Sequence, residues 1–153
     1  MVDVHTPAQR SANMRAIRHK DTGPEVQIRR LLFARGFRFR IHVKALPGSP
    51  DIVLPKHRVA IFVQGCFWHS HGCHLFKVPA TRTEFWMEKI RANCERDHRN
   101  EEALISASWR IITVWECALK GRYKRKVDEI ISQITDWILT PDPKSQRLDI
   151  THL

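Results

Sequence analysis

Sulfur and imidazole side chains gather with aromatic rings in one short segment, GCFWHSHGCHLF, at residues 65–76. Four side chains of the chain could supply three sulfurs and one imidazole, the closed tetrahedral set that holds structural zinc: Cys66, His71, Cys73 and Cys117. Two further histidines compete with them as ligands: His69 and His74. The clustering favours a zinc site over unligated side chains, and Cys94 is interpreted separately as a core residue of a helix.

Acidic side chains supply a second candidate site. Asp51 follows Pro50 at the start of an apolar strand, and Asp97 falls on the apolar face of a predicted long helix. A lone acid on an apolar face costs stability unless it is paired or binds a ligand. Glu101 shares that face, so a polar boundary of the helix is the alternative interpretation. Glu25 fits the capping box of another helix, and a loop-supporting role is the alternative for Asp51.

An acid at a strand start with further acids nearby is typical of Mg²⁺-dependent phosphodiester hydrolysis, because hard oxygen ligands hold the ion and orient a water. Many nucleases built on such a sheet have an acid and a lysine on the next strand, but residues 59–65 contain neither. His69 follows that strand and can transfer protons near neutral pH in place of the lysine. A zinc-stabilised DNA-binding module without catalysis is the competing interpretation.

The apolar periodicity predicts the elements that must position these groups. Helices are predicted over residues 6–20, 22–36, 83–107 and 123–138, and strands over 37–43, 50–54, 59–63 and 109–115. A turn at residues 55–58 predicts a hairpin, and Thr81 with Glu84 predicts a capping box for the third helix. The order helix, helix, three strands, helix, strand, helix predicts an α/β sandwich around a mixed sheet.

The composition favours one compact domain that binds a polyanion. The 153 residues are 42% hydrophobic, which suffices for one core. Lys and Arg number 26 against 16 Asp and Glu, and residues 1–50 contain ten basic and three acidic side chains. This concentration of positive charge favours nucleic acid through counterion release, with a basic soluble surface as the alternative.

The cysteines and the N-terminus bear on the compartment. No stretch approaches the ~20 apolar residues of a membrane span, and MVDVHTPAQRS lacks the apolar core of a secretory signal. We therefore expect a cytoplasmic protein without membrane association. In that reducing compartment the four cysteines are expected to be ligands or core residues rather than disulfides.

Several separated blocks of the sequence point to one family. They are Arg10-Ser11-x-Asn13-Met14-Arg15-Ala16-Ile17, Leu46-Pro47-Gly48-x-Pro50-Asp51, Gly65-Cys66-Phe67-Trp68-His69, Phe76-Lys77-Val78-Pro79-Ala80-Thr81-Arg82-Thr83-Glu84-Phe85-Trp86 and Val114-Trp115-Glu116-Cys117-Ala118-Leu119. In these blocks the chain resembles the very short patch repair DNA mismatch endonucleases, bacterial enzymes that nick DNA beside a thymine mispaired with guanine. The resemblance extends from the first block to about residue 140.

This resemblance implies a three-layer restriction-endonuclease-like fold, with a mixed central sheet flanked by helices and a structural zinc on the four ligands named above. It implies that Asp51 and the main-chain carbonyl of Val63 bind a catalytic Mg²⁺, with His69 as the proton-transfer residue. Two acids are implied to support the metal-bound waters: Asp97 and Glu25. Gln64 departs from the pattern, because the family often has histidine at that position.

The resemblance also implies how DNA is recognised. An aromatic wedge enters the major groove and stacks beside the mismatch: Phe67, Trp68 and Trp86. Met14 and Ile17 approach from the minor groove, on a basic arm that includes Arg15. Intercalation costs a few kcal/mol of unstacking per step, and less at a weak mismatch, which gives selectivity.

The implied activity is a nick 5′ to the thymine of a T:G mismatch, which arises by deamination of 5-methylcytosine. Residues 1–20 are expected to be an arm that orders on DNA, residues 21–140 the endonuclease domain, and residues 141–153 a polar tail. We expect a nucleoid-associated monomer whose partners are mismatched duplex DNA and mismatch-repair proteins. A related nuclease with another DNA substrate is a further alternative.

Overall fold

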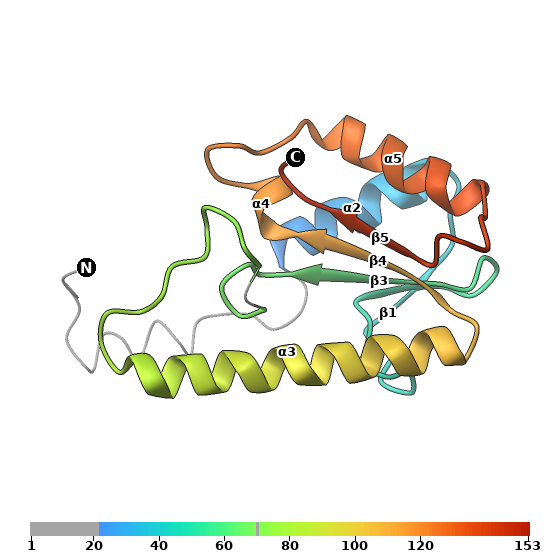
Figure 1. Ribbon diagram of the computed structural model, residues 1–153. Helices are drawn as coiled ribbons and strands as arrows, with labels where there is room; N and C mark the ends of the chain where they lie inside the picture. The colour runs from blue at the N-terminus through green and yellow to red at the C-terminus, as the bar shows by residue number, and fades with distance from the viewer. Residues whose placement is uncertain (1–21, 70) are drawn as a thin grey trace.

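Figure 1 shows the chain as a computed structural model, which describes residues 22–69 and 71–153. The elements are α2 (Gly23–Ala34), β1 (Arg40–Ile41), β2 (Ile52–Leu54), β3 (Val59–Gln64), α3 (Thr83–Ser106), β4 (Arg110–Trp115), α4 (Glu116–Leu119), α5 (Val127–Leu139) and β5 (Arg147–Ile150). Within the described residues, no helix is long and apolar enough to cross a membrane. The predicted helix over residues 6–20 lies outside the described part of the chain.

The five strands form one mixed sheet in the order β1-β2-β3-β4-β5. The β1–β2 and β2–β3 pairs are antiparallel, whereas β3–β4 and β4–β5 are parallel. The hairpin predicted at residues 55–58 joins β2 to β3, so this prediction is confirmed. Parallel pairing of β3 with β4 requires a crossover, and α3 supplies it.

Helices cover both faces of the sheet, which gives three layers (Figure 1). The residues of β3 alternate between the two faces: Val59 and Ile61 join the core with α2 and α5, whereas Ala60 and Phe62 join a smaller cluster with α3. All four are buried, which explains why the sequence of this strand is apolar throughout. The predicted mixed α/β sandwich is therefore confirmed.

The first strand is shorter than predicted. Residues 37–43 were expected to be extended, but β1 contains only Arg40–Ile41. The reason is local, because His42 adopts a φ of 50°, in the left-handed region, and so leaves the pleat. Its backbone stays close to the sheet, since the N–H of His42 donates to the carbonyl oxygen of Asp51 at 3.1 Å.

The segment predicted as a polar tail, residues 141–153, instead contains strand β5, which pairs in parallel with β4. Its side chains alternate: Leu148 is partly buried against the main core, and Ile150 is fully buried within it. The two polar residues of the strand are exposed: Arg147, which precedes Leu148, and Asp149, which lies between Leu148 and Ile150. The strand is stable because it covers the edge of β4 and contributes one aliphatic side chain to the core.

The N-termini of α2 and α3 are capped differently. Thr22 caps α2 as predicted, because its side-chain oxygen accepts from the N–H of Glu25 at 3.4 Å. The capping box predicted for α3 is wrong, since the N-cap residue is Arg82, which makes no side-chain cap bond. The hydroxyl of Thr83 donates instead to the carbonyl of Pro79 at 2.7 Å, which ties the helix start to the preceding loop.

Candidate active site and metal centre

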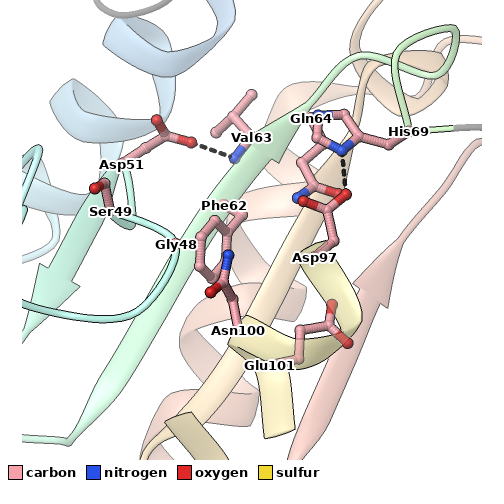
Figure 2. Close-up of a pocket in the computed structure, with 10 residues that line it drawn as sticks. All are labelled: Gly48, Ser49, Asp51, Phe62, Val63, Gln64, His69, Asp97, Asn100 and Glu101. Atoms are coloured by element: carbon pink, nitrogen blue, oxygen red, sulfur yellow. Dashed lines mark hydrogen bonds and ion pairs between the residues drawn. The ribbon is translucent and has the colours of Figure 1, made fainter. Parts of the chain in front are cut away.

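A cavity of about 300 Å³ opens at the carboxyl end of β3. It is lined by Gly48, Ser49, Asp51, Phe62, Val63, Gln64, His69, Asp97, Asn100 and Glu101 (Figure 2). The cavity thus brings together Asp51, His69 and Asp97, which lie far apart in the sequence. Figure 2 shows Asp51 on one side of the end of β3 and the pair of His69 and Asp97 on the other.

Gly48 forms one wall of this cavity by a close approach that a side chain would prevent. Its φ is +78°, and an added Cβ would lie 3.1 Å from the ring of Phe62 and 3.2 Å from the Cβ of Asn100. Both distances are tighter than ordinary contact, and a φ in this region favours glycine. The loop before Asp51 can therefore close over β3 only with glycine at this position.

Asp51 is a partly buried carboxylate, at the residue before β2. The pKa of Asp51 is raised to about 6, mainly by burial. The hydrogen bond from the main-chain N–H of Val63 lowers this pKa, and the charge of the nearby Glu25 raises it. That N–H donates to Oδ2 of Asp51 at 2.8 Å. Because the N–H and C=O of one strand residue face the same side, the Val63 carbonyl also faces Asp51. A cation at this position would offset the cost of burying the charge.

His69 and Asp97 form a hydrogen-bonded pair through His69 Nδ1 and Asp97 Oδ2 (Figure 2). In the neutral ring the Nδ1–H donates to the carboxylate, so Nε2 has the free lone pair. The loop backbone is held as well, since the thiol of Cys94 donates to the carbonyl of His69 at 3.3 Å. In this arrangement Asp97 can orient the imidazole, and the role with metal-bound waters that the resemblance implied stays a prediction.

Cys94 occupies an intermediate environment on α3 rather than the core that was predicted for it. It belongs to neither of the two buried clusters. Its helical spacing from Ile90 was the basis of the core prediction, but the helix face that contains Ile90 is only partly covered at this end. The residue instead joins α3 to the segment that contains His69.

The carboxylate of Glu25 makes side-chain contacts that its position in a capping box does not predict. Its main chain is capped by Thr22, while its carboxylate is only 2% exposed and lies 3.1 Å from Nε2 of His42 and 3.5 Å from Nη1 of Arg29. Glu25, His42 and Asp51 each offer a ligand atom, and these atoms all lie within 4.8 Å of one another. This group could hold a metal ion.

His42 was missed in the sequence, although one feature could have found it. The register of the antiparallel β1–β2 pair places Ile41 opposite Ile52, so the residue after β1, His42, lies opposite the residue before β2, Asp51. An imidazole opposite a candidate metal ligand is informative once the register is known. The periodicity of residues 37–43 does not give that register.

A second donor group lies at the end of the parallel strands and unites the four side chains predicted as zinc ligands. The donor atoms of Cys66, His71, Cys73 and Cys117 all lie within 4.8 Å of one another. Nδ1 of His71 is 3.5 Å from Sγ of Cys66 and 3.6 Å from Sγ of Cys117. A tetrahedral zinc ion with ordinary bond lengths places a sulfur and a nitrogen about 3.6 Å apart. The four residues therefore fit a tetrahedral metal.

The electrostatics of this second group also fit a cation. Burial raises the pKa of the Cys66 thiol and of the Cys117 thiol, and burial lowers the pKa of His71. A bound cation would favour the thiolates, and the neutral imidazole is the form that binds metal. The His71 ring is held by stacking on Trp115, with centroids 4.3 Å apart and planes inclined by 11°.

The two histidines that were competing ligands lie elsewhere. His69 pairs with Asp97, and the His74 ring packs edge-on against Tyr123 and His152, with centroids 4.8 Å and 5.1 Å away. His152 was not predicted to belong to the site, yet its Nδ1 lies 3.4 Å from Sγ of Cys117. It reaches the cluster because β5 runs parallel to β4, so that His152 after β5 and Cys117 after β4 lie at the same end of the sheet.

The predicted aromatic wedge residues form one cluster. The ring of Phe67 lies 5.1 Å from Trp68 and 6.0 Å from Trp86, and the two tryptophans lie 5.7 Å apart. All three are partly buried, and the Nζ of Lys89 lies 5.7 Å from the Trp68 ring. Asn93 donates to the carbonyl of Trp68 at 3.4 Å and so fixes the loop against α3. The other predicted DNA contacts lie outside the described residues: Met14, Arg15 and Ile17.

The sequence model of one family, described as "DNA mismatch endonuclease Vsr", matches residues 2–75. The DNA mismatch endonuclease Vsr of Escherichia coli (strain K12) is 51% identical over 138 residues, which span 90% of this chain and 88% of that protein. The type II nicking enzyme V.NmeAIP of Neisseria meningitidis is 42% identical over 89% of this chain and 99% of its own length. The type II nicking enzyme V.XorIIP of Xanthomonas oryzae pv. oryzae is 48% identical over 78% and 88%. This chain belongs to the family of Vsr DNA mismatch endonucleases.

Proposed function

We propose that this protein nicks one strand of duplex DNA on the 5′ side of the thymine in a T:G mismatch, by Mg²⁺-dependent hydrolysis of the phosphodiester. The observation that supports this most is the cavity in which Asp51 lies with the pair of His69 and Asp97. The relatives named as a mismatch endonuclease and as nicking enzymes support cleavage of a single strand. Such a mismatch arises when 5-methylcytosine is deaminated.

We assign the Mg²⁺ ion to Asp51 and the main-chain carbonyl of Val63, with Glu25 as a second acid beside the ion. When bound, the ion polarises the phosphate and stabilises charge on the attacking and leaving oxygens. The partly buried carboxylate of Asp51 supports this assignment, because hard oxygen donors suit Mg²⁺. Val63 can serve through its main chain, which explains how an apolar strand takes part in the site.

His69 is the proton-transfer residue of the proposed reaction. Its Nε2 accepts a proton from the attacking water, and the imidazolium that forms is stabilised by the Asp97 carboxylate on Nδ1. Asp97 is thus a positioning residue that sets the tautomer and the orientation of the ring. The partial exposure of both side chains, 24% and 26%, leaves the ring accessible to water and to a phosphate in the cavity.

The four-residue cluster is proposed to hold structural Zn²⁺. Cys66, His71 and Cys73 belong to the loop that contains His69, and Cys117 belongs to α4 after β4. An ion on all four would fix that loop to the end of the sheet, since the ligands come from both segments. The loop would then keep His69 and the aromatic rings at a constant position relative to Asp51.

Recognition of the mismatch is assigned to the aromatic cluster and to the basic arm. Phe67, Trp68 and Trp86 stack into the base step from the major groove, while the arm with Met14, Arg15 and Ile17 enters the minor groove. Unstacking costs a few kcal/mol per step and less at a mismatch, so the wedge favours defective sites. We expect the enzyme to act as a nucleoid-associated cytoplasmic monomer alongside mismatch-repair proteins.

The assignment of the active site is tested by replacing Asp51 with asparagine. Asp51→Asn retains the shape of the side chain and an acceptor for the Val63 N–H, but it removes the charge that holds the ion. We expect T:G binding to be retained and Mg²⁺-dependent nicking to fall by about 10³-fold or more, measured on a labelled duplex under single turnover. Asp136→Asn, an exposed acid on α5, is the matched control and should nick normally. Nicking by Asp51→Asn at the unmodified rate would overturn the assignment.

A second candidate is a nicking enzyme with a different DNA target. Relatives named as type II nicking enzymes, such as those of Neisseria meningitidis and Xanthomonas oryzae, favour it. The same cavity would serve, because its residues act on the sugar–phosphate backbone rather than on bases. Perfectly paired, T:G-mismatched and branched duplexes compared side by side distinguish the two functions.

A further inference from the structure

Glu25, His42 and Asp51 reach one place from three elements: the first turn of α2, the residue after β1 and the residue before β2. Their ligand atoms lie within 4.8 Å of one another, and Glu25 is only 2% exposed. Glu25 raises the cost of charging Asp51, because like charges repel in a site of low dielectric, while His42 and Arg29 lie beside the Glu25 carboxylate. Such a cluster is stable when a positive charge lies between its members.

The backbone aims His42 at this group at some cost. His42 has a φ of 50°, in the left-handed region, which is unfavourable for a residue other than glycine. The hydrogen bond from its N–H to the Asp51 carbonyl, 3.1 Å long, holds it there. Backbone strain of this kind persists where surrounding structure imposes it and is common at functional sites. In this conformation Nε2 of His42 lies 3.1 Å from Oε2 of Glu25.

The spacing of these atoms suits one metal ion. Ligand bonds of about 2.1 Å at right angles place neighbouring donor atoms about 3.0 Å apart, which agrees with the 3.1 Å between Glu25 and His42. Two carboxylates and one imidazole are a mixed set of oxygen and nitrogen donors. Mg²⁺ prefers oxygen alone, whereas first-row transition ions also bind imidazole.

We infer that Glu25, His42 and Asp51 bind one divalent ion between them, with His42 as a nitrogen ligand, so that the site binds Mn²⁺ more tightly than Mg²⁺. This inference rests on the proposed nuclease function, because it names further ligands of the ion assigned to Asp51. In this inference Glu25 is a direct ligand of the ion, whereas the proposed function placed it beside the ion. His42 is the ligand that gives the site its higher affinity for Mn²⁺ than for Mg²⁺.

The test is Mn²⁺ binding to the zinc-loaded full-length protein without DNA. Free Mn²⁺ is measured by electron paramagnetic resonance, and the nitrogen ligand is detected by electron spin echo. His42→Gln can still donate to Glu25, and His42→Asn suits a positive φ but is too short to reach the ion. His98→Gln, an exposed histidine on α3 that pairs with Glu102, is the matched control.

We expect nitrogen coupling to bound Mn²⁺ in the unmodified protein and in His98→Gln, and its loss in both His42 variants. Mn²⁺ affinity should fall by about tenfold or more in those variants, with a smaller change for Mg²⁺. Nitrogen coupling that survives in folded His42 variants, or its absence from the unmodified protein, would overturn the inference. Circular dichroism establishes that the variants are folded.

Nicking of a T:G duplex is measured separately on the same preparations. Mn²⁺ held by His42 in a protein that nicks nothing contradicts only the proposed function. Nicking without a nitrogen ligand contradicts only the ligand assignment.

Discussion

Asp51, the proposed Mg²⁺ ligand, is a residue whose charge is unfavourable for folding. Its carboxylate is held at the start of β2 beside Glu25, where burial raises its pKa to about 6. The ordinary pKa in an unfolded chain is about 3.9. Folding therefore makes ionisation of Asp51 less favourable than it is in the unfolded chain. At neutral pH the ionised carboxylate lowers stability until a cation compensates the charge.

This predicts a pH-dependent effect of Asp51→Asn on stability. Because the folded-state pKa is raised, the contribution of Asp51 is most favourable below about pH 4 and is lost as the pH rises through about 6. In Mg²⁺-free buffer, Asp51→Asn should stabilise the protein at pH 8, on the order of 1–2 kcal/mol, and the gain should shrink at pH 5. Urea unfolding at the two pH values measures it, with Asp136→Asn as the control. A loss of stability at pH 8, or a difference independent of pH, contradicts the prediction.

For single residues, the sequence identified which side chains line the cavity better than which side chains contact each other. Asp51 and His69 were found from their positions relative to strands, and both line the cavity. The bond between His69 and Asp97 was not predicted, because it joins a loop to a helix 28 residues away. His42 was missed for the same reason. His42, the residue after β1, brings an imidazole close to Asp51.

At the scale of elements, the loop after β3 supplies three of the four residues of the proposed zinc cluster, and α3 also holds this loop through Asn93 and Cys94. It contains Cys66, His71 and Cys73 together with His69, and only Cys117 comes from α4. The loop and the start of α3 also contact each other through Phe67 and Trp86. A metal on the cluster would therefore stabilise both the fold and the site.

Cys117→Ser is expected to lower zinc content and stability together, because binding at a structural site contributes folding free energy. Zinc is measured by elemental analysis of the purified protein and stability by thermal unfolding. Cys94→Ser is the matched control, since Cys94 lies outside the four-residue cluster and serine can still donate to the His69 carbonyl. Unchanged zinc content in Cys117→Ser would exclude the proposed ligand set.

Strand β5 is predicted to be an integral part of the domain. Ile150→Ala leaves a cavity in the main core, where Ile150 is fully buried, and should cost about 2–4 kcal/mol. Leu153→Ala, at a residue that is 92% exposed, should change stability by less than about 0.5 kcal/mol. Chemical denaturation of both variants measures the difference. Equal stability of the two would show that β5 is dispensable.

Among the elements, β3, β4 and α3 were predicted close to their observed bounds, whereas β5 lies in a segment that was predicted to be a polar tail. The sequence of β3 is apolar throughout, and α3 is long, so both were found close to their observed bounds. In β5, only Leu148 and Ile150 indicate a strand, and this two-residue alternation is too short to distinguish from a coil. The start of α3 was predicted correctly, but the capping box of Thr81 and Glu84 was not, because Arg82 is the N-cap residue and makes no side-chain cap bond.

Across the whole molecule, the chemistry is concentrated at one end. Figure 1 shows the start of α3 extending past the strand ends, on the same side as the loop after β3. Membership in the Vsr family implies a restriction-endonuclease-like fold, and the five-stranded mixed sheet is consistent with it. The net charge of +10 favours association with DNA before any base is recognised.

The most direct test is strand-specific cleavage of a panel of end-labelled duplexes that differ at one base pair, with and without Mg²⁺. We predict a single cut on the 5′ side of the mispaired thymine in the T:G duplex, which leaves a 5′-phosphate and requires a divalent ion. The T:A duplex should remain intact under the same conditions. Intact T:G duplexes at every Mg²⁺ concentration tested, or equal cutting of T:A and T:G, would contradict the proposed function.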